Sequence, residues 1–319
     1  MITFSFIPKE NEFENFKTIY NQLREKGISG IETIIGDHLD FSEYKNYPIK
    51  GVHLLYYPTW LEFWKGDWKK VKEDFYDDEG IKNYYRSFKK NILIETFKEQ
   101  FENAKKIDAE YMVFHVSHVR PKDIFQFDFQ YTDLEVLDEC IKIVNEVFKG
   151  EGPLLLFENL PWPGLNFRDY ELTRYFIQKV KYKNKGFLLD FSHLICLERE
   201  VTNFEEANKF IIDRIGKMKE LKDYIFGLHV NGVKFDKFLD CDFQNKISEW
   251  EKGDRYEKFQ IELNHMKNID PHLLYKGNIN EIIKYLPNFK YINLELGFSS
   301  LLELKEKVLE QLNYLKINF

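Results

Sequence analysis

The stretch GFLLDFSHL, residues 186–194, places a carboxylate and an imidazole directly after an apolar run. The apolar letters are typical of a strand buried on both faces, and such a strand has no structural need for Asp190 or His193. An unpaired ion in an apolar setting costs several kcal/mol, so these groups persist where they are paired or bound to something. Asp190 and His193 are therefore candidates for chemistry.

Other apolar runs in the chain end in the same residue types. The set of candidate ligands comprises His53, His115, Glu158, Asp190, His193, His229, Asp270, His272 and Glu295. Five of the eight histidines belong to this set. Imidazoles mixed with carboxylates suit Zn²⁺, and also Mn²⁺ or Fe²⁺. The set predicts a metal centre, and nine ligands exceed the needs of one tetrahedral ion. Either several ions, or one ion with catalytic side chains around it, would account for them.

The elements that must position these residues alternate along the whole chain. Eight runs with strand composition lie at 2–7, 30–35, 51–57, 111–116, 153–160, 186–191, 224–230 and 291–296. Amphipathic runs typical of helices lie at 13–27, 94–107, 134–150, 170–181, 205–221 and 301–315. This alternation predicts an α/β fold of the closed (β/α)8 TIM-barrel type, in which the strand ends converge on one face. A doubly wound open sheet is the alternative, but its Gly-rich first turn is absent.

A single domain over residues 1–319 is expected, because no linker or low-complexity tract divides the chain. Two segments, at about 58–92 and about 233–268, exceed the connections of a plain barrel. Both follow C-terminal ends of predicted strands, the third and the seventh, which lie opposite each other in the barrel. The two insertions would therefore meet over its mouth. Trp60, Trp64 and Trp68 in the first insertion indicate either packing on the barrel flank or a lid.

Composition narrows the classes of partner and compartment. A net charge of −7 gives no basic footprint for nucleic acid. The three cysteines are far apart and form no CxxC pair, as expected in a reducing cytoplasm. The N-terminus lacks the pattern of a signal peptide, and no apolar stretch approaches membrane-spanning length. A cytoplasmic protein without a membrane partner is expected, and no oligomeric state is indicated.

The motifs around the ligands resemble the endonuclease IV and xylose isomerase-like TIM-barrel superfamily, of the AP endonuclease 2 type. They read HLLYY, FHVSH, FEN, DFSH, HVN, DPH…GNI and LELG and cover nearly the whole chain apart from the insertions. The resemblance to endonuclease IV implies three zinc ions held by all nine candidates. Sugar isomerases and epimerases of this superfamily resemble only a subset that holds one Mn²⁺-type ion, namely Glu158, Asp190, His229 and Glu295. In those enzymes the two glutamates move protons and the histidine matching His193 helps to bind substrate.

The DxH motif after strand seven and the histidines on strands three and four favour the branch with several metals. The resemblance thus implies catalytic roles for Glu158, Glu295 and His193, with zinc as the favoured ion and manganese, cobalt or iron as alternatives, in one to three copies. The strand-four motif reads HVSH, which departs from the HPGSH-like form of the repair enzymes. The candidates for substrate binding are Tyr56, His118, Trp64 and Lys234. Glu32 in SGIETII is either structural or adjacent to substrate.

Three functions fit these features to different degrees. A metal-dependent hydrolase acting on a small, phosphorylated or sugar-like substrate is favoured, because metal ions activate water and stabilise anionic transition states. An acidic, partly covered pocket suits a small molecule better than DNA, so an abasic-site endonuclease is not favoured. The alternative is a sugar or sugar-phosphate isomerase or epimerase in which Glu158 and Glu295 form an acid–base pair. A non-catalytic binding protein would leave the clustered ligands unexplained.

Overall fold

The computed structural model describes residues 1–36, 39–236 and 238–315. Residue 237, inside the second predicted insertion, and residues 316–319, at the end of the predicted domain, lie outside the described residues.

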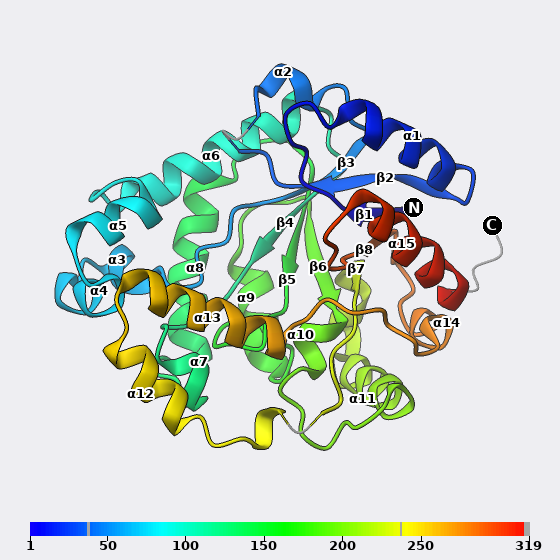
Figure 1. The fold of residues 1–319 in the computed structure, drawn as a ribbon. Coiled ribbons are helices and arrows are strands. Elements are labelled where there is room, and N and C mark those ends of the chain that lie inside the picture. Colours follow the sequence, from blue (N-terminus) through cyan, green and yellow to red (C-terminus); the bar gives the residue numbers. More distant parts are fainter. Residues whose placement is uncertain (37–38, 237, 316–319) are drawn as a thin grey trace.

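Eight strands form a closed ring in chain order. They are β1 (Ile2–Ser5), β2 (Ile28–Thr33), β3 (Ile49–His53), β4 (Tyr111–His115), β5 (Leu154–Glu158), β6 (Lys185–Asp190), β7 (Ile225–Val230) and β8 (Tyr291–Leu294). Every neighbouring pair is parallel, and β1 pairs with both β2 and β8, which closes the sheet. Figure 1 shows the strands surrounded by helices. The predicted (β/α)8 TIM barrel is confirmed.

The alternation of side chains along each strand decides what lies inside the barrel. Tyr111, Leu156 and Leu188 form part of one buried cluster, and residues two further along the same strands share their face. On β5 and β6 those residues are Glu158 and Asp190, the last residues of their strands and both candidate ligands. On β4 that residue is Val113, and the next residue on the same face is His115, the strand's last residue. Gly51 provides space for this packing, because a Cβ atom there would lie 2.3 Å from the Tyr111 ring. Apolar side chains thus fill the barrel toward the N-terminal ends of the strands, and the polar groups gather at the C-terminal ends.

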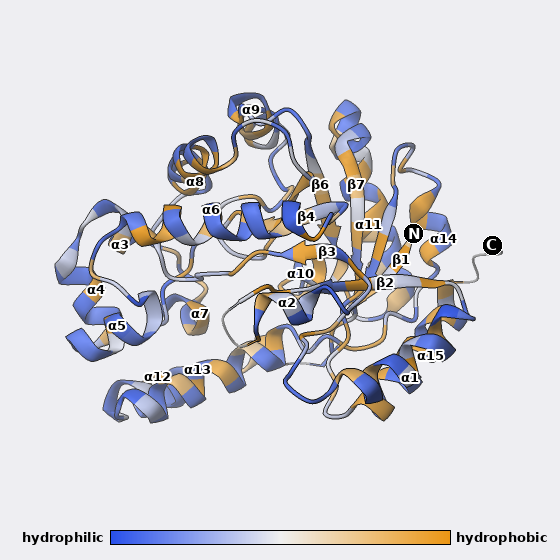
Figure 2. Cartoon of the chain, turned by 90° about the horizontal axis from the view of Figure 1, so that it is seen from above, coloured by the Kyte–Doolittle hydropathy of each residue, from blue (hydrophilic) through white to orange (hydrophobic). Residues whose placement is uncertain are grey.

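Helices cover the outside of the barrel. The six predicted ones are present as α1 (Phe13–Arg24), α6 (Asn91–Lys106), α8 (Asp133–Val147), α9 (Tyr170–Lys179), α11 (Phe204–Lys217) and α15 (Leu301–Leu315). Shorter helices are α2 (Phe41–Tyr44), α7 (Asp123–Gln126), α10 (Phe191–Ile195), η1 (Lys219–Tyr224) and α14 (Ile279–Ile283). Figure 2 shows helices that alternate hydrophilic and hydrophobic residues around more hydrophobic strands. Helix α11 ends earlier than predicted, because Lys219 adopts a left-handed φ of 51° and a 3-10 turn follows.

The two insertions are helical and contact each other. The first contains α3 (Leu61–Lys65), α4 (Trp68–Phe75) and α5 (Asp78–Tyr85), and the second contains η2 (Phe238–Asp240), α12 (Gln244–Lys252) and α13 (Arg255–Ile269). Arg255 of α13 forms ion pairs with Asp77 (3.3 Å) and Glu79 (3.2 Å) of the first insertion. Figure 1 shows α3, α4 and α5 beside α12 and α13, on one side of the molecule. Among the described helices, none has the length and apolarity needed to cross a bilayer.

The tryptophans of the first insertion do not form one helical stripe. Gly66 ends α3 in a left-handed conformation, with φ of 76°, and α4 begins at Trp68. Trp60 is buried and donates its indole N–H to the Ser117 carbonyl at 2.7 Å. The four-residue spacing therefore spans a helix break, which the periodicity of the letters did not reveal.

Candidate metal centre

The candidate ligands lie where the strands end. His53, His115, Glu158 and Asp190 are the last residues of β3, β4, β5 and β6. His115 is paired in register with Glu158, and Asp190 with His229 of β7. This register brings side chains from distant parts of the sequence to one level of the barrel.

A local turn explains how both polar residues of DFSH reach the site. Asp190 caps helix α10, and its Oδ1 accepts the backbone N–H of His193 at 2.7 Å. The chain therefore turns immediately after the strand instead of continuing with alternating faces. His193 Nδ1 comes within 3.6 Å of Asp190 Oδ1 and 3.1 Å of Glu158 Oε1.

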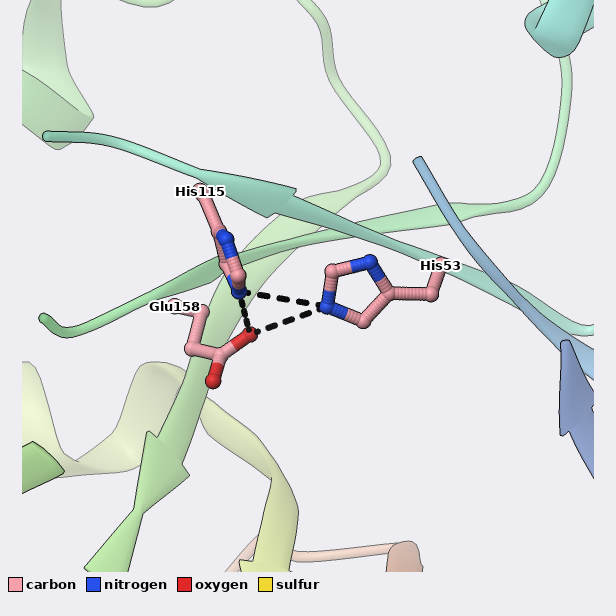
Figure 3. Close-up of side chains that lie close together, drawn as sticks. All are labelled: His53, His115 and Glu158. Carbon is pink, nitrogen blue, oxygen red and sulfur yellow. Dashed lines mark hydrogen bonds and ion pairs between the residues drawn. The ribbon is translucent and has the colours of Figure 1, made fainter. Parts of the chain in front are cut away.

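The first group of ligand atoms comes from His53, His115 and Glu158 (Figure 3). The two Nε2 atoms of the histidines are 3.1 Å apart, and Glu158 Oε2 lies 2.8 Å from His115 Nε2 and 3.5 Å from His53 Nε2. His53 Nδ1 donates to the Leu54 carbonyl at 2.9 Å. This bond fixes the proton of a neutral His53 ring on Nδ1 and leaves the Nε2 lone pair directed into the group.

The second group comes from Glu158, Asp190, His229 and Glu295. His229 Nδ1 lies 3.2 Å from Glu158 Oε1, 3.0 Å from Glu295 Oε2 and 3.7 Å from Asp190 Oδ2. On the other side of the ring, His229 Nε2 is 3.0 Å from a carboxylate oxygen of buried Glu32. Because Glu32 accepts the Nε2 proton, a neutral His229 ring would direct its Nδ1 lone pair toward the three carboxylates.

A third set of ligand atoms surrounds Asp270, which follows α13. Its Oδ2 is 3.1 Å from His193 Nε2 and 2.9 Å from His272 Nε2. His193 Nδ1 donates to the Asn159 carbonyl at 3.0 Å, which leaves Nε2 as the free nitrogen. Ser192 donates its hydroxyl to Asp270 Oδ1 at 2.6 Å and thereby holds the carboxylate in place.

The electrostatics of the protein alone show why this cluster needs positive charge. Burial acts to raise the pKa of Glu158, but the interactions with His115 and His229 outweigh it and hold that pKa well below its ordinary value. Burial raises the pKa of Asp190 to about 6, and Glu158 and Glu295 add to this rise against the influence of His193. Burial acts to lower the pKa of His229, but surrounding carboxylates raise it well above its ordinary value. Protons on imidazoles thus supply the charge that cations would otherwise provide.

The donor atoms fit divalent ions. In each of the first two groups one atom per residue lies within 4.8 Å of all the others. Ligands bound to one zinc ion at about 2.0–2.2 Å are themselves about 3.3–3.6 Å apart, so small adjustments would close each group around an ion. The nitrogen and oxygen donors, with no thiolate among them, suit Zn²⁺, Mn²⁺ or Fe²⁺.

The residues predicted to bind substrate lie in different surroundings. Tyr56 packs edge-on against His115, with ring centroids 4.4 Å apart, and its hydroxyl is 2.8 Å from Ser117 Oγ. His118 is buried away from the ligand groups, with Nε2 3.3 Å from Glu62 Oε2.

The other two lie on the insertions. The indole of Trp64 donates to Glu139 of α8 at 2.9 Å, and Lys234 donates to Asn268 of α13 at 3.0 Å. The structure therefore brings Tyr56 to the ligands, and the contacts of Trp64 and Lys234 are with neighbouring helices.

Supporting residues around the ligands escaped the sequence analysis. Asn231 donates to Asp190 Oδ2 at 2.8 Å and to Glu295 Oε2 at 3.4 Å. Asn159 Oδ1 accepts the backbone N–H of Asp190 at 2.8 Å. Both asparagines lie just after strand-end polar residues in FEN and HVN, and a buried amide in that position is the signal that could have identified them.

Comparisons with known proteins place these observations in context. Residues 88–267 match the family model described as xylose isomerase-like TIM barrel. The structure of AsbF, a probable 3-DHS dehydratase from Bacillus anthracis, is 14% identical; the alignment covers 99% of this chain and 100% of that chain, with a TM-score of 0.53. Endonuclease IV from Thermus thermophilus is 12% identical, with 99% and 98% covered and a TM-score of 0.50. At these identities the similarity concerns the fold. No curated protein sequence gives a significant match.

Proposed function

This chain belongs to the xylose isomerase-like TIM barrel family, and from that premise we propose that it is a divalent-metal-dependent hydrolase acting on a small, phosphorylated or sugar-like substrate. The family resemblance of the motifs is thereby confirmed. We expect zinc as the resident metal, in two or three copies, with manganese, cobalt or iron as substitutes.

The linkage of the ligand groups carries this proposal. Glu158 belongs to both of the first two groups, and its Oε1 also lies 3.1 Å from His193 Nδ1, next to Asp270. A single ion needs only the second group, so His53, His115 and His272 would have no ligand role in a one-metal enzyme. A centre with several ions uses them all.

The chain supplies orientation and proton handling around such a centre. Bound divalent ions would lower the pKa of a coordinated water toward 7 and stabilise negative charge that develops on the substrate. Glu32 and the Leu54 carbonyl hold His229 and His53 in the required tautomers. Glu158 and Asp190 are fully buried, but the Glu295 side chain is 19% exposed. Among the carboxylates of the second group, Glu295 is therefore the one that can exchange a proton with substrate, at Oε1.

His193 is the second residue that faces substrate in this proposal. Its side chain is 9% exposed, and its ring lies between the second group and Asp270, with Nδ1 3.1 Å from Glu158 Oε1 and Nε2 3.1 Å from Asp270 Oδ2. From this position it would orient the substrate group that leaves, and Glu158 would hold the two ligand groups at a fixed separation.

The second group taken alone favours a different function. Glu158, Asp190, His229 and Glu295 form a complete site for one ion, as a sugar or sugar-phosphate isomerase or epimerase would require. In that scheme Glu158 and Glu295 would both move protons at substrate carbon. Full burial of Glu158, with His115 Nε2 2.8 Å from Oε2, makes that role harder for Glu158 than for Glu295.

The two functions predict different products from the same enzyme preparation. Zinc-loaded and manganese-loaded protein should be assayed with 4-nitrophenyl phosphate and bis(4-nitrophenyl) phosphate, and in parallel with a panel of ketoses and their phosphates. We expect release of 4-nitrophenol with zinc, abolished by Glu295→Gln. Interconversion of sugars with manganese and no hydrolysis of either ester would overturn the hydrolase proposal in favour of the isomerase.

A further inference from the structure

A cavity of about 580 Å³ lies between the two insertions. Phe75, Tyr76 and Tyr84 line it from the first insertion, and Phe259, Leu263 and Met266 of α13 line it from the second. Its volume is in the range of small-molecule sites, which are mostly apolar and have few polar groups. It is outside the set of candidate metal ligands, so the proposed function does not yet use it. We refer to it as the insertion cavity.

The insertion cavity adjoins the elements that carry the metal ligands. Pro58 and Val119 form part of its lining, in the loops that follow His53 and His115, and the Val119 N–H donates to the Pro58 carbonyl at 2.9 Å. Met266 lies one helical turn before Asp270, whose N–H donates to the Met266 carbonyl at 2.8 Å. A molecule bound in this cavity would therefore contact the loops that follow β3 and β4 and the helix that precedes Asp270.

The charged groups of the lining already have partners. Arg120 holds Asp74 through Nη2–Oδ1 at 2.8 Å and through two Nε contacts at 3.1 Å. Arg255 is paired with the first insertion, and Glu262 Oε1 accepts the indole N–H of Trp250 at 2.6 Å. Because both arginines are paired with carboxylates and Glu262 is hydrogen-bonded within the protein, an ionic or many-hydroxyl ligand group would find few partners there.

Tyr76 is the polar exception. Within the described part of the chain its buried hydroxyl has no hydrogen-bond partner. Its backbone has φ of 68° and ψ of −46°, which is a rare conformation for an aromatic residue. Strained residues of this kind cluster at ligand sites, and buried polar atoms normally have partners. A ligand in the cavity would pack against the ring of this residue.

We propose that the insertion cavity receives an uncharged aryl or alkyl group of the substrate, whose polar end reaches the ligand cluster. The substrate class is then an amphiphilic ester, rather than a free sugar or a nucleic acid. This inference rests on the proposed hydrolase function and adds the part of the substrate that is distant from the reacting atoms.

Binding of an uncharged fluorophore, N-phenyl-1-naphthylamine, tests the cavity separately from catalysis. Leu263→Trp fills the cavity and should weaken binding on the order of tenfold, which equals about 1.4 kcal/mol. Phe259→Glu places a charge on the wall at a ring that is 56% exposed, so folding is little affected, and it should weaken binding too. Leu302→Trp, the same exchange at an exposed site on α15, is the matched control and should bind as the unaltered protein does.

Kinetics with 4-nitrophenyl phosphate and methyl phosphate complete the test on zinc-loaded protein. We expect Leu263→Trp to raise KM for the aryl ester on the order of tenfold and to leave the methyl ester unchanged. Loss of fluorophore binding in both cavity variants with no hydrolysis of either ester would support the cavity and refute the hydrolase. Hydrolysis with no preference for the aryl ester, and fluorophore binding unaffected by both variants, would refute the cavity inference and leave the hydrolase intact.

Discussion

The ligand cluster and the insertion cavity are built on opposite principles. In the cluster, buried His229 has carboxylates on both sides of its ring, so negative charge is concentrated and is balanced either by protons on imidazoles or by cations. In the cavity, Arg120 and Asp74 neutralise each other and the remaining surface is largely apolar. The barrel strands thus position charge for chemistry, and the insertions provide shape. The comparison predicts that variants of the cluster will change metal content and hydrolysis, and that variants of the insertions will change ligand binding or stability.

The largest effect is expected for Glu158, which joins the ligand groups. Glu158→Gln removes the charge shared by the first two groups, so ions should be lost from both. Hydrolysis should fall more than 100-fold, because loss of a residue that only hydrogen-bonds to a metal ligand typically costs roughly 10- to 100-fold. Metal per chain by mass spectrometry and kcat/KM check this. Glu110→Gln, at an exposed ion pair with Lys50, is the control. Full metal content in Glu158→Gln would refute the shared-ligand role.

A smaller effect is expected from the residue behind the ligands. Glu32→Leu removes the acceptor of the His229 Nε2 proton, so metal affinity should fall roughly 10- to 100-fold in competition with a chelator. Glu62→Leu removes a matching buried carboxylate, beside His118 outside the ligand groups. That variant should lower stability and leave metal affinity unchanged. Equal losses of affinity in the two variants would show that general destabilisation, and not the tautomer of His229, is responsible.

A pH effect on stability is expected on the side of the insertions. Burial raises the pKa of Glu262 to about 7, against the hydrogen bond from Trp250 and the charge of Lys258. The folded protein therefore binds the proton of Glu262 more tightly than the unfolded chain does. As pH rises from the ordinary pKa of a glutamate to about 7, the stability that this proton provides is lost. Glu262→Gln removes the titration and should raise Tm more at pH 8 than at pH 5. Glu306→Gln, at an exposed position on α15, is the control substitution. Equal Tm shifts for Glu262→Gln at the two pH values would refute the buried titration.

The smallest effect is expected at Trp64, which the sequence analysis assigned to substrate binding. Trp64→Phe removes the hydrogen bond to Glu139, at a cost of about 1 kcal/mol in the free energy of unfolding. KM should stay within about twofold of the unaltered value, because the indole of Trp64 bonds to Glu139 of α8 and not to a candidate metal ligand. A large rise in KM with normal stability would restore the substrate-binding hypothesis.

The barrel could be predicted, and a set of candidate ligands proposed, because both depend on local patterns. Alternating strands and helices identify the fold. A histidine or carboxylate that directly follows an apolar run such as FLL or LLLF stands out because the run itself contains no polar residue. Glu32 was harder, because its role depends on β2 placing it beside His229, far away in sequence. The insertion cavity could not be predicted from the sequence, because it forms only where α4 and α13 come together in the folded structure. The tryptophan spacing also contained no sign of the helix break between Trp64 and Trp68, where Gly66 ends α3.

The central claim is that the strand ends hold more than one ion, and anomalous X-ray scattering measured on either side of the zinc edge tests it directly. Crystals grown from zinc-loaded protein should show one peak among His53, His115 and Glu158 and another among Glu158, Asp190, His229 and Glu295. A third peak beside Asp270 and His272 would complete the set implied by the family resemblance. One peak alone, within the second group, would contradict this claim and support the alternative function, a one-metal isomerase or epimerase.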